Sequence, residues 1–130
     1  GSTSLSSHQG KEIVVLDFWA TWCPPCREGL PMLSKVAQKY SSRGVKFYTV
    51  NLREDSGKIR QFIQKTGLSL PVLLDKEGSV AGQYGVSSIP TTVIIDKQGV
   101  VQSVHTGLLP NMEQALGQEL ETLLSGGSLL

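Results

Sequence analysis

A nearly continuous apolar segment leads directly into two closely spaced cysteines. Residues 13–18 (IVVLDF) have the composition of a strand that is covered on both faces of a sheet. Residues 19–31 (WATWCPPCREGLP) follow and contain Cys23 and Cys26, the only two cysteines of the chain. From Pro24 onward, apolar residues recur at steps of three and four, which indicates a helix. The sequence therefore predicts a buried strand that feeds a helix through a turn carrying both thiols.

Strand and helix patterns alternate along the rest of the chain. We expect further strands at residues 45–51, 71–75, 91–96 and 100–106, and further helices at residues 55–67, 79–85 and from Pro110 onward. The second of the four predicted helices should direct Ile59, Phe62 and Ile63 toward the core. This order of elements predicts an α/β fold with a mixed central sheet and helices on both faces.

Residues 11–125 are expected to form one domain. Residues 1–10 are polar and rich in glycine and serine, so they are predicted to be a flexible lead-in, and Gly1 and Ser2 look like a cloning scar. Residues 126–130 are predicted to be a frayed tail. A chain of 130 residues buries roughly two-thirds of the surface that it exposes when unfolded, so it needs no disulfide to fold.

Charge and hydropathy argue against several kinds of partner. The formal net charge is +1 and the basic residues are scattered, so we expect no nucleic-acid binding. No apolar run approaches the roughly 20 residues of a membrane span, and no secretory signal is visible. If Gly1 and Ser2 are a cloning scar, a native leader or anchor has been cut away, and its absence from this sequence does not indicate the compartment.

The spacing of the two cysteines favours redox chemistry. A strand that feeds a helix places Cys23 at the helix N-terminus, where unpaired N–H groups and the helix dipole stabilise a thiolate. Neither Pro24 nor Pro25 has an N–H group, so the Cys26 N–H is the expected main-chain donor to Cys23, and both prolines preorganise the first turn. Cys26, one turn further along, suits the resolving role. Cys23 would attack a substrate disulfide, and Cys26 would then release the mixed disulfide.

Other uses of a Cys-X-X-Cys pair fit less well. A structural zinc site needs about four ligands, and only His8 and His105 remain as candidates, neither at metal-ligand spacing. Covalent haem attachment needs a histidine directly after the second cysteine, where this chain has Arg27. A structural disulfide over this separation closes too small a loop to constrain the unfolded chain much. We therefore expect no metal site and no cofactor.

Three segments resemble thioredoxin-fold proteins. LDFWATWCPPC at residues 16–26 resembles the active-site segment of the family. Pro31, a few residues later, matches the proline that kinks the helix after that segment. GVSSIPTTVIID at residues 85–96 resembles the segment with the family's cis-proline, here Pro90, and HTGLL at residues 105–109 resembles its glycine loop. A helix and the strand PVLLD inserted in the middle of the chain are similar to the TlpA/ResA branch of bacterial thiol–disulfide oxidoreductases.

The resemblance implies a reductase of protein disulfides and a substrate surface. It implies that Trp22, Ile89, Pro90 and Gly107 form a shallow apolar surface around Cys23, whereas Trp19 is structural. Expected partners are a disulfide-bearing protein, with apocytochrome c in cytochrome c maturation as one setting, and an upstream thiol reductant. The expected form is a monomer in the bacterial periplasm or on the outer face of the cytoplasmic membrane, with the cytoplasm left open.

The sequence departs from that branch at two positions near the cysteines. Gly29 stands where members of the branch often have glutamate, and Asp17 stands where they often have asparagine. Asp17 lies in the apolar strand, six residues before Cys23, and burial there would raise the pKa of its carboxyl. It would then suit proton transfer for Cys26. The alternative is an acid at the end of a strand that reaches solvent.

Two other functions compete with the reductase. A thiol peroxidase of the peroxiredoxin type, by family resemblance, needs a threonine three residues and a proline seven residues before its reactive cysteine. Ala20 and Leu16 occupy those places before Cys23. The other possibility is a non-catalytic binding module with a vestigial cysteine pair. Because reduction potentials of Cys-X-X-Cys proteins span about −270 to −120 mV, the sequence leaves oxidase, isomerase and reductase open.

Overall fold

The computed structural model describes residues 4–130, so the expected cloning scar at Gly1 and Ser2 lies outside the described residues. The elements follow in the order 3-10 helix η1 (Leu5–His8), β1 (Ile13–Trp19), α1 (Pro24–Tyr40), 3-10 helix η2 (Ser41–Arg43), β2 (Val45–Leu52), α2 (Ser56–Thr66), β3 (Val72–Asp75), α3 (Ser79–Gln83), β4 (Thr91–Ile95), β5 (Val101–Thr106) and α4 (Met112–Leu124).

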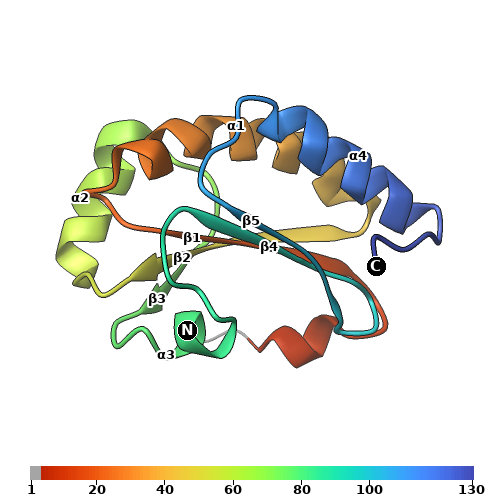
Figure 1. Ribbon diagram of the computed structural model, residues 1–130. Helices are drawn as coiled ribbons and strands as arrows, with labels where there is room; N and C mark the ends of the chain where they lie inside the picture. The colour runs from red at the N-terminus through yellow and green to blue at the C-terminus, as the bar shows by residue number, and fades with distance from the viewer. Residues whose placement is uncertain (1–3) are drawn as a thin grey trace.

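The five strands form one mixed sheet with the order β3-β2-β1-β4-β5 (Figure 1). β1 runs parallel to β2, β2 runs parallel to β3, and β4 is antiparallel to both β1 and β5. β1 is central and is buried along its whole length. The mixed sheet, with α2 and β3 inserted between β2 and β4, confirms the predicted thioredoxin-like architecture.

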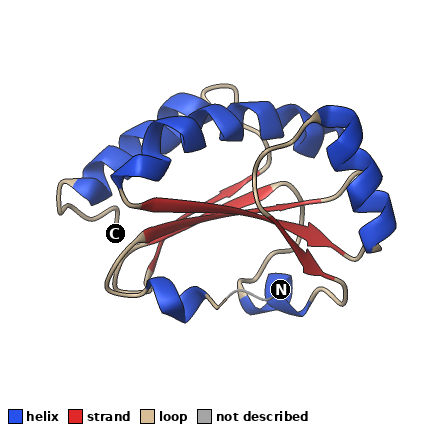
Figure 2. Ribbon diagram, turned by 180° about the vertical axis from the view of Figure 1, so that it is seen from behind, coloured by secondary structure: helices blue, strands red, loops and turns tan. Residues whose placement is uncertain are grey.

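Helices cover both faces of the sheet, as predicted (Figure 2). α1 and α4 cover one face, while α3 and η1 lie over the other (Figure 1). Side chains alternate along β1, because successive residues of a strand point to opposite faces. Ile13 and Val15 therefore pack with residues of α1 and α4, whereas Leu16 and Phe18 pack with Ala81 of α3.

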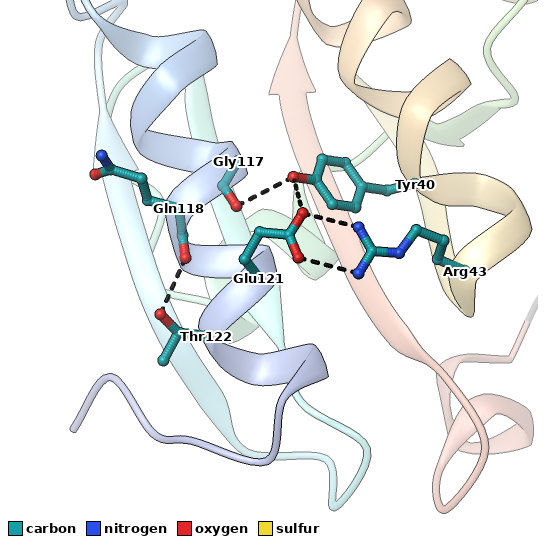
Figure 3. Close-up of polar contacts among 6 residues, drawn as sticks. All are labelled: Tyr40, Arg43, Gly117, Gln118, Glu121 and Thr122. Carbon is teal, nitrogen blue, oxygen red and sulfur yellow. Dashed lines mark hydrogen bonds and ion pairs between the residues drawn. The ribbon is translucent and has the colours of Figure 1, made fainter.

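Polar contacts join α1 and η2 to α4 (Figure 3). The Arg43 guanidinium donates two hydrogen bonds to the Glu121 carboxylate, at 2.8 and 3.0 Å. The Tyr40 hydroxyl donates to the same carboxylate at 2.9 Å. These contacts hold the pKa of Glu121 down at about 2, with the hydrogen bonds from Arg43 as the largest cause.

The start of α4 and the burial of α2 differ from the predictions. α4 begins at Met112 rather than Pro110, because the Met112 N–H bonds to the Leu109 carbonyl in a turn that contains the proline. In α2, Ile59 is fully buried, but Phe62 and Ile63 are only half-buried. Pro31 lies inside α1, which continues through it to Tyr40.

Both terminal segments make contacts that the expected loose ends would lack. Leu5, in η1, packs against the apolar cluster under α3, and His8 bonds to Tyr48 at 2.8 Å. At the other end, the Leu129 N–H donates to the Gln102 side chain at 2.8 Å, and the Leu129 side chain packs on the core. Apolar side chains within these polar segments therefore hold them against the sheet.

Candidate active site

Cys23 and Cys26 lie where β1 passes into α1, and a disulfide joins them. Cys23 is the N-cap of α1, and Pro24 and Pro25 occupy the first two helical positions. The Cys26 N–H donates to Cys23 Sγ at 3.3 Å, the contact expected from the absence of a donor at both prolines. The structure thus places Cys23 at the positive end of the helix dipole, where a thiolate is stabilised.

The two cysteines are less accessible than the residue before them. Cys26 is 1% exposed and Cys23 4% exposed, whereas Trp22 is 66% exposed. Cys23 is thus the outer of the two cysteines, as predicted, but only by a narrow margin. Trp22 forms an exposed lip beside it, and Trp19 is fully buried, in keeping with its predicted structural role.

The loop that carries Pro90 faces the disulfide. The Ile89–Pro90 peptide bond is cis, as the resemblance implied. The Ile89 carbonyl oxygen lies 3.8 Å from Cys23 Sγ. Gly107 is the first residue after β5 and has a φ of +86°. Its N–H donates to the Pro90 carbonyl at 2.7 Å, so the segment after β5 supports this loop.

The four residues expected to form one apolar surface divide between two hollows. Trp22 and Ile89 line an open groove to which neither cysteine contributes. Pro90 and Gly107 instead line a small cavity of about 10 Å³, together with Cys26. Gly29, which stands where members of the branch often have glutamate, also lines this cavity and places no carboxylate there.

Asp17 lies on the wall of the same small cavity as Cys26. It is 6% exposed, which excludes the alternative of an acid that reaches solvent. In the sheet it pairs with Thr49 on one side and Thr92 on the other, and the Thr92 hydroxyl donates to it at 3.3 Å. Burial raises the pKa of Asp17 to about 7, against a smaller lowering effect of the bond from Thr92. The group can therefore gain or lose a proton near neutral pH.

Glu54 is a site residue that sequence reasoning missed. It follows β2 and is 8% exposed. Its carboxylate accepts hydrogen bonds from the Thr21 N–H at 2.7 Å, from the Thr21 hydroxyl, and from the Asn51 side chain at 2.9 Å. Burial by itself would raise the pKa of Glu54, but these bonds outweigh it and lower the pKa. The carboxylate thus fastens the loop that leads to Cys23. The only signal in the sequence was an acid just after a strand parallel to β1.

The two histidines are engaged elsewhere. His8 contacts Glu12 at 2.7 Å, and His105 contacts Glu119 at 2.8 Å, each far from the cysteine pair in the chain. Within residues 4–130, no three His, Cys, Asp or Glu side chains gather as a metal site would require. No helix of this described part is both long and apolar enough to cross a membrane.

Comparisons with known proteins agree with this geometry. Residues 1–104 match the family described as AhpC/TSA. The chain is 34% identical over 119 residues to the thiol–disulfide oxidoreductase ResA of Geobacillus thermodenitrificans, an alignment that covers 92% of this chain and 67% of that protein. The chain spans between 58% and 68% of the length of such curated relatives.

Solved structures of similar proteins share the fold. The protein assigned as thiol:disulfide interchange protein DsbE in Chlorobium tepidum superposes with a TM-score of 0.85 at 35% identity, covering 92% of this chain and 84% of that one. The exposed lipoprotein thioredoxin of Streptococcus pneumoniae gives a TM-score of 0.79 at 30% identity, covering 90% and 88%. From its fold, its cysteine pair and these relatives, the chain belongs to the AhpC/TSA family and, among thioredoxin-fold proteins, to the ResA-like thiol–disulfide oxidoreductases.

Proposed function

We propose that this chain reduces protein disulfides through a cycle of the Cys23–Cys26 pair. The observation that carries the proposal is the position of Cys23 as the N-cap of α1, with the Cys26 N–H directed at its sulfur. Both features favour a thiolate on Cys23 once the pair is reduced, and the thiolate is the attacking species.

The cycle balances in two steps. The Cys23 thiolate attacks one sulfur of a substrate disulfide, so that a mixed disulfide forms and the first substrate thiolate leaves. The Cys26 thiolate then attacks the Cys23 sulfur, which releases the second substrate thiolate and closes the Cys23–Cys26 disulfide. Two electrons pass to the substrate, and an upstream dithiol must return them to the pair. These two steps need no metal or cofactor.

Asp17 is proposed as the proton acceptor for Cys26. The second step requires Cys26 as a thiolate, and Cys26 is 1% exposed, so its proton needs a buried acceptor. Asp17 lines the same cavity, and its pKa of about 7 allows it to be ionised at neutral pH. In this role Asp17 takes a proton from Cys26 Sγ. Pro24, Pro25 and Pro31 have a different proposed role, which is to shape the helix that carries both cysteines.

The proposed substrate surface consists of Trp22 and Ile89, which line the open groove, while Pro90 and Gly107 line the small cavity and support the Ile89 loop. Within residues 4–130, the Ile89 main chain makes no backbone–backbone hydrogen bond, so it can pair with an extended substrate segment. An oxidised cysteine pair of an apocytochrome c is one such substrate. The proposed setting is outside the cytoplasm, which the similarity to an exposed lipoprotein thioredoxin supports. The proposed form is a monomer.

Reduction of insulin by dithiothreitol tests the activity. The protein is expected to accelerate the reaction, Cys23→Ser to abolish the acceleration, and Cys26→Ser to accumulate the mixed disulfide. Equilibration with glutathione buffers, read by mass spectrometry, gives the reduction potential. A value near about −120 mV would contradict the reductase and favour an oxidase.

The second candidate function is a thiol peroxidase of the peroxiredoxin type, which the match to the AhpC/TSA family favours. A peroxide-consumption assay tests it. The chain has Ala20 and Leu16 at the positions where a peroxiredoxin-type enzyme needs threonine and proline. We therefore expect peroxide to disappear no faster with the protein than with dithiothreitol alone. Turnover of peroxide that depends on Cys23 would replace the reductase proposal.

A further inference from the structure

A groove of about 700 Å³ lies beside the cysteine pair and is not used by the redox cycle. Its wall is mostly apolar, and its lining includes Trp22, Leu52, Arg53, Gly78, Ala81 and Ile89. Because the Ile89 carbonyl lies 3.8 Å from Cys23 Sγ, the groove begins within reach of the reacting sulfur. A polypeptide whose disulfide meets Cys23 can therefore continue into it.

Arg53 places one positive charge on this apolar wall. Its φ of 56° makes it the one non-glycine residue with positive φ among the residues that the structure describes. Such a backbone persists when surrounding contacts hold it, and it recurs at functional sites. Here the Arg53 N–H donates to the Asp75 carbonyl at 3.0 Å, which ties the turn after β2 to the end of β3.

The Arg53 guanidinium lies against the backbone of Gly78. A Cβ atom added at Gly78 would come within 2.6 Å of Arg53 Nε and 2.9 Å of one terminal nitrogen. Gly78 also has a φ of +76°, which favours glycine. The absence of a side chain at position 78 thus allows the guanidinium to occupy this part of the groove.

No carboxylate of residues 4–130 lies within ion-pair distance of Arg53. The residues that line the groove also include no aspartate or glutamate. By contrast, Arg43 is paired with Glu121, and Lys58 lies 3.6 Å from Glu54. The groove therefore offers a guanidinium with no carboxylate of residues 4–130 within ion-pair distance, on a wall that is mostly apolar.

We propose that this groove is a substrate subsite that selects an acidic side chain close to the substrate's disulfide. The inference rests on the proposed reductase activity and names the class of protein on which it acts. The substrate's carboxylate pairs with the Arg53 guanidinium, whose planar donors suit a carboxylate, while neighbouring apolar side chains contact Trp22 and Ile89. A basic side chain at the same place is disfavoured by repulsion from Arg53.

Three disulfide-cyclised peptides test the subsite. They share one Cys-X-X-Cys ring and differ only in flanking residues, which are acidic, neutral or basic. We expect kcat/KM for the acidic peptide to exceed that for the basic peptide by about two- to fivefold, the upper part of the range for an exposed ion pair. The preference should disappear in Arg53→Gln and persist in Arg53→Lys. Lys65→Gln, which removes an equal charge from the end of α2, should keep it.

The neutral peptide separates the two proposals. If neither the original chain nor any variant reduces the neutral peptide, the proposal of a reductase activity is itself wrong. If the original chain reduces all three peptides equally, or Arg53→Gln retains the preference, the activity stands and the subsite is wrong. If Arg53→Gln fails to fold, the three peptides on the original chain still test the subsite, because equal reduction of all three would exclude it.

Two glycine substitutions test the position of the guanidinium. Gly78→Ala puts a methyl group where Arg53 lies, whereas Gly67→Ala adds the same strain at a φ of +70° with no atom within 4 Å of the new group. We expect the acidic preference to fall only in Gly78→Ala. Equal preference in the two variants would overturn the fixed placement of Arg53.

Discussion

Asp17 and Cys26 line one small cavity of about 10 Å³ next to the cis-proline loop. The cavity has about the volume needed to hold one water molecule, so a single water between the two groups can carry a proton from one to the other. This relationship connects the central strand of the sheet to the resolving cysteine, and the first two predictions depend on it.

Asp17→Asn should slow release of the mixed disulfide, because the variant lacks the proton acceptor for Cys26. We expect a loss of about tenfold to a hundredfold at neutral pH, at or below the usual range for general-base catalysis. In the original chain the rate should rise with pH through the Asp17 pKa of about 7. Stopped-flow measurement of mixed-disulfide decay between about pH 6 and about pH 9 tests this.

Thr92→Val is the matched control for that profile. It keeps the Asp17 carboxyl but removes the hydrogen bond that lowers its pKa, so the rise in rate should move to higher pH. An identical pH profile in the original chain and Asp17→Asn would rule out Asp17 as the base.

The buried carboxyl should also make stability depend on pH. The pKa of Asp17 is about 7 in the folded chain, against 3.8 ordinarily. The folded state therefore binds this proton more tightly, and the stabilising effect, present below about pH 4, is lost as pH rises toward 7. The loss is on the order of 4 kcal/mol as an upper limit.

Guanidinium unfolding at about pH 5 and about pH 8 measures this effect. The stability difference between Asp17→Asn and the original chain should move in favour of the variant at the higher pH. Parallel pH dependences in the two proteins would contradict a raised pKa for Asp17.

The Glu121 carboxyl should also make the stability of the fold depend on pH, at low pH and with the opposite sign to Asp17. Its pKa is lowered from 4.5 to about 2 by Arg43 and Tyr40, so the folded state favours the carboxylate. Its stabilising effect is full above about pH 4.5 and is lost as the pH falls toward 2. Glu121→Gln should therefore be less stable than the original chain near neutral pH but not near pH 2. Thermal unfolding along an acid titration measures the difference. Glu113→Gln, on the same helix, serves as control, and an equal effect of both variants would contradict the assignment.

Glu54→Gln should weaken the loop before Cys23. The amide keeps the size of the side chain but can accept fewer of the hydrogen bonds from Thr21 and Asn51. We expect a loss of about 1–3 kcal/mol of stability, the cost of an unsatisfied buried group. Insulin reduction should slow as well, because Thr21 lies two residues before the reactive cysteine. Chemical denaturation and the insulin assay together measure both effects. Unchanged values in both, matching those of Glu77→Gln on the surface, would show that Glu54 does not fasten the loop.

Local patterns predicted most of the elements because they depend on few neighbours. The strand at residues 13–18 and the helix from Pro24 needed only apolar periodicity and the chemistry of proline, and both are present. The start of α4 was wrong by two residues, because Pro110 suits both a first helical position and the preceding turn. Only the contact of Leu109 with Met112 distinguishes these two conformations.

By itself, the sequence determined the position of the cysteine pair at a strand–helix junction and the donor that faces Cys23, because both follow from backbone chemistry within a few residues. The tertiary structure alone decided that Asp17 is buried beside Cys26, that Glu54 holds the Thr21 loop, and that Arg53 lies on Gly78. Each of these contacts joins segments that are far apart in the chain or placed by a turn. Burial and pairing of charge arise only when the sheet and its connections bring such segments together.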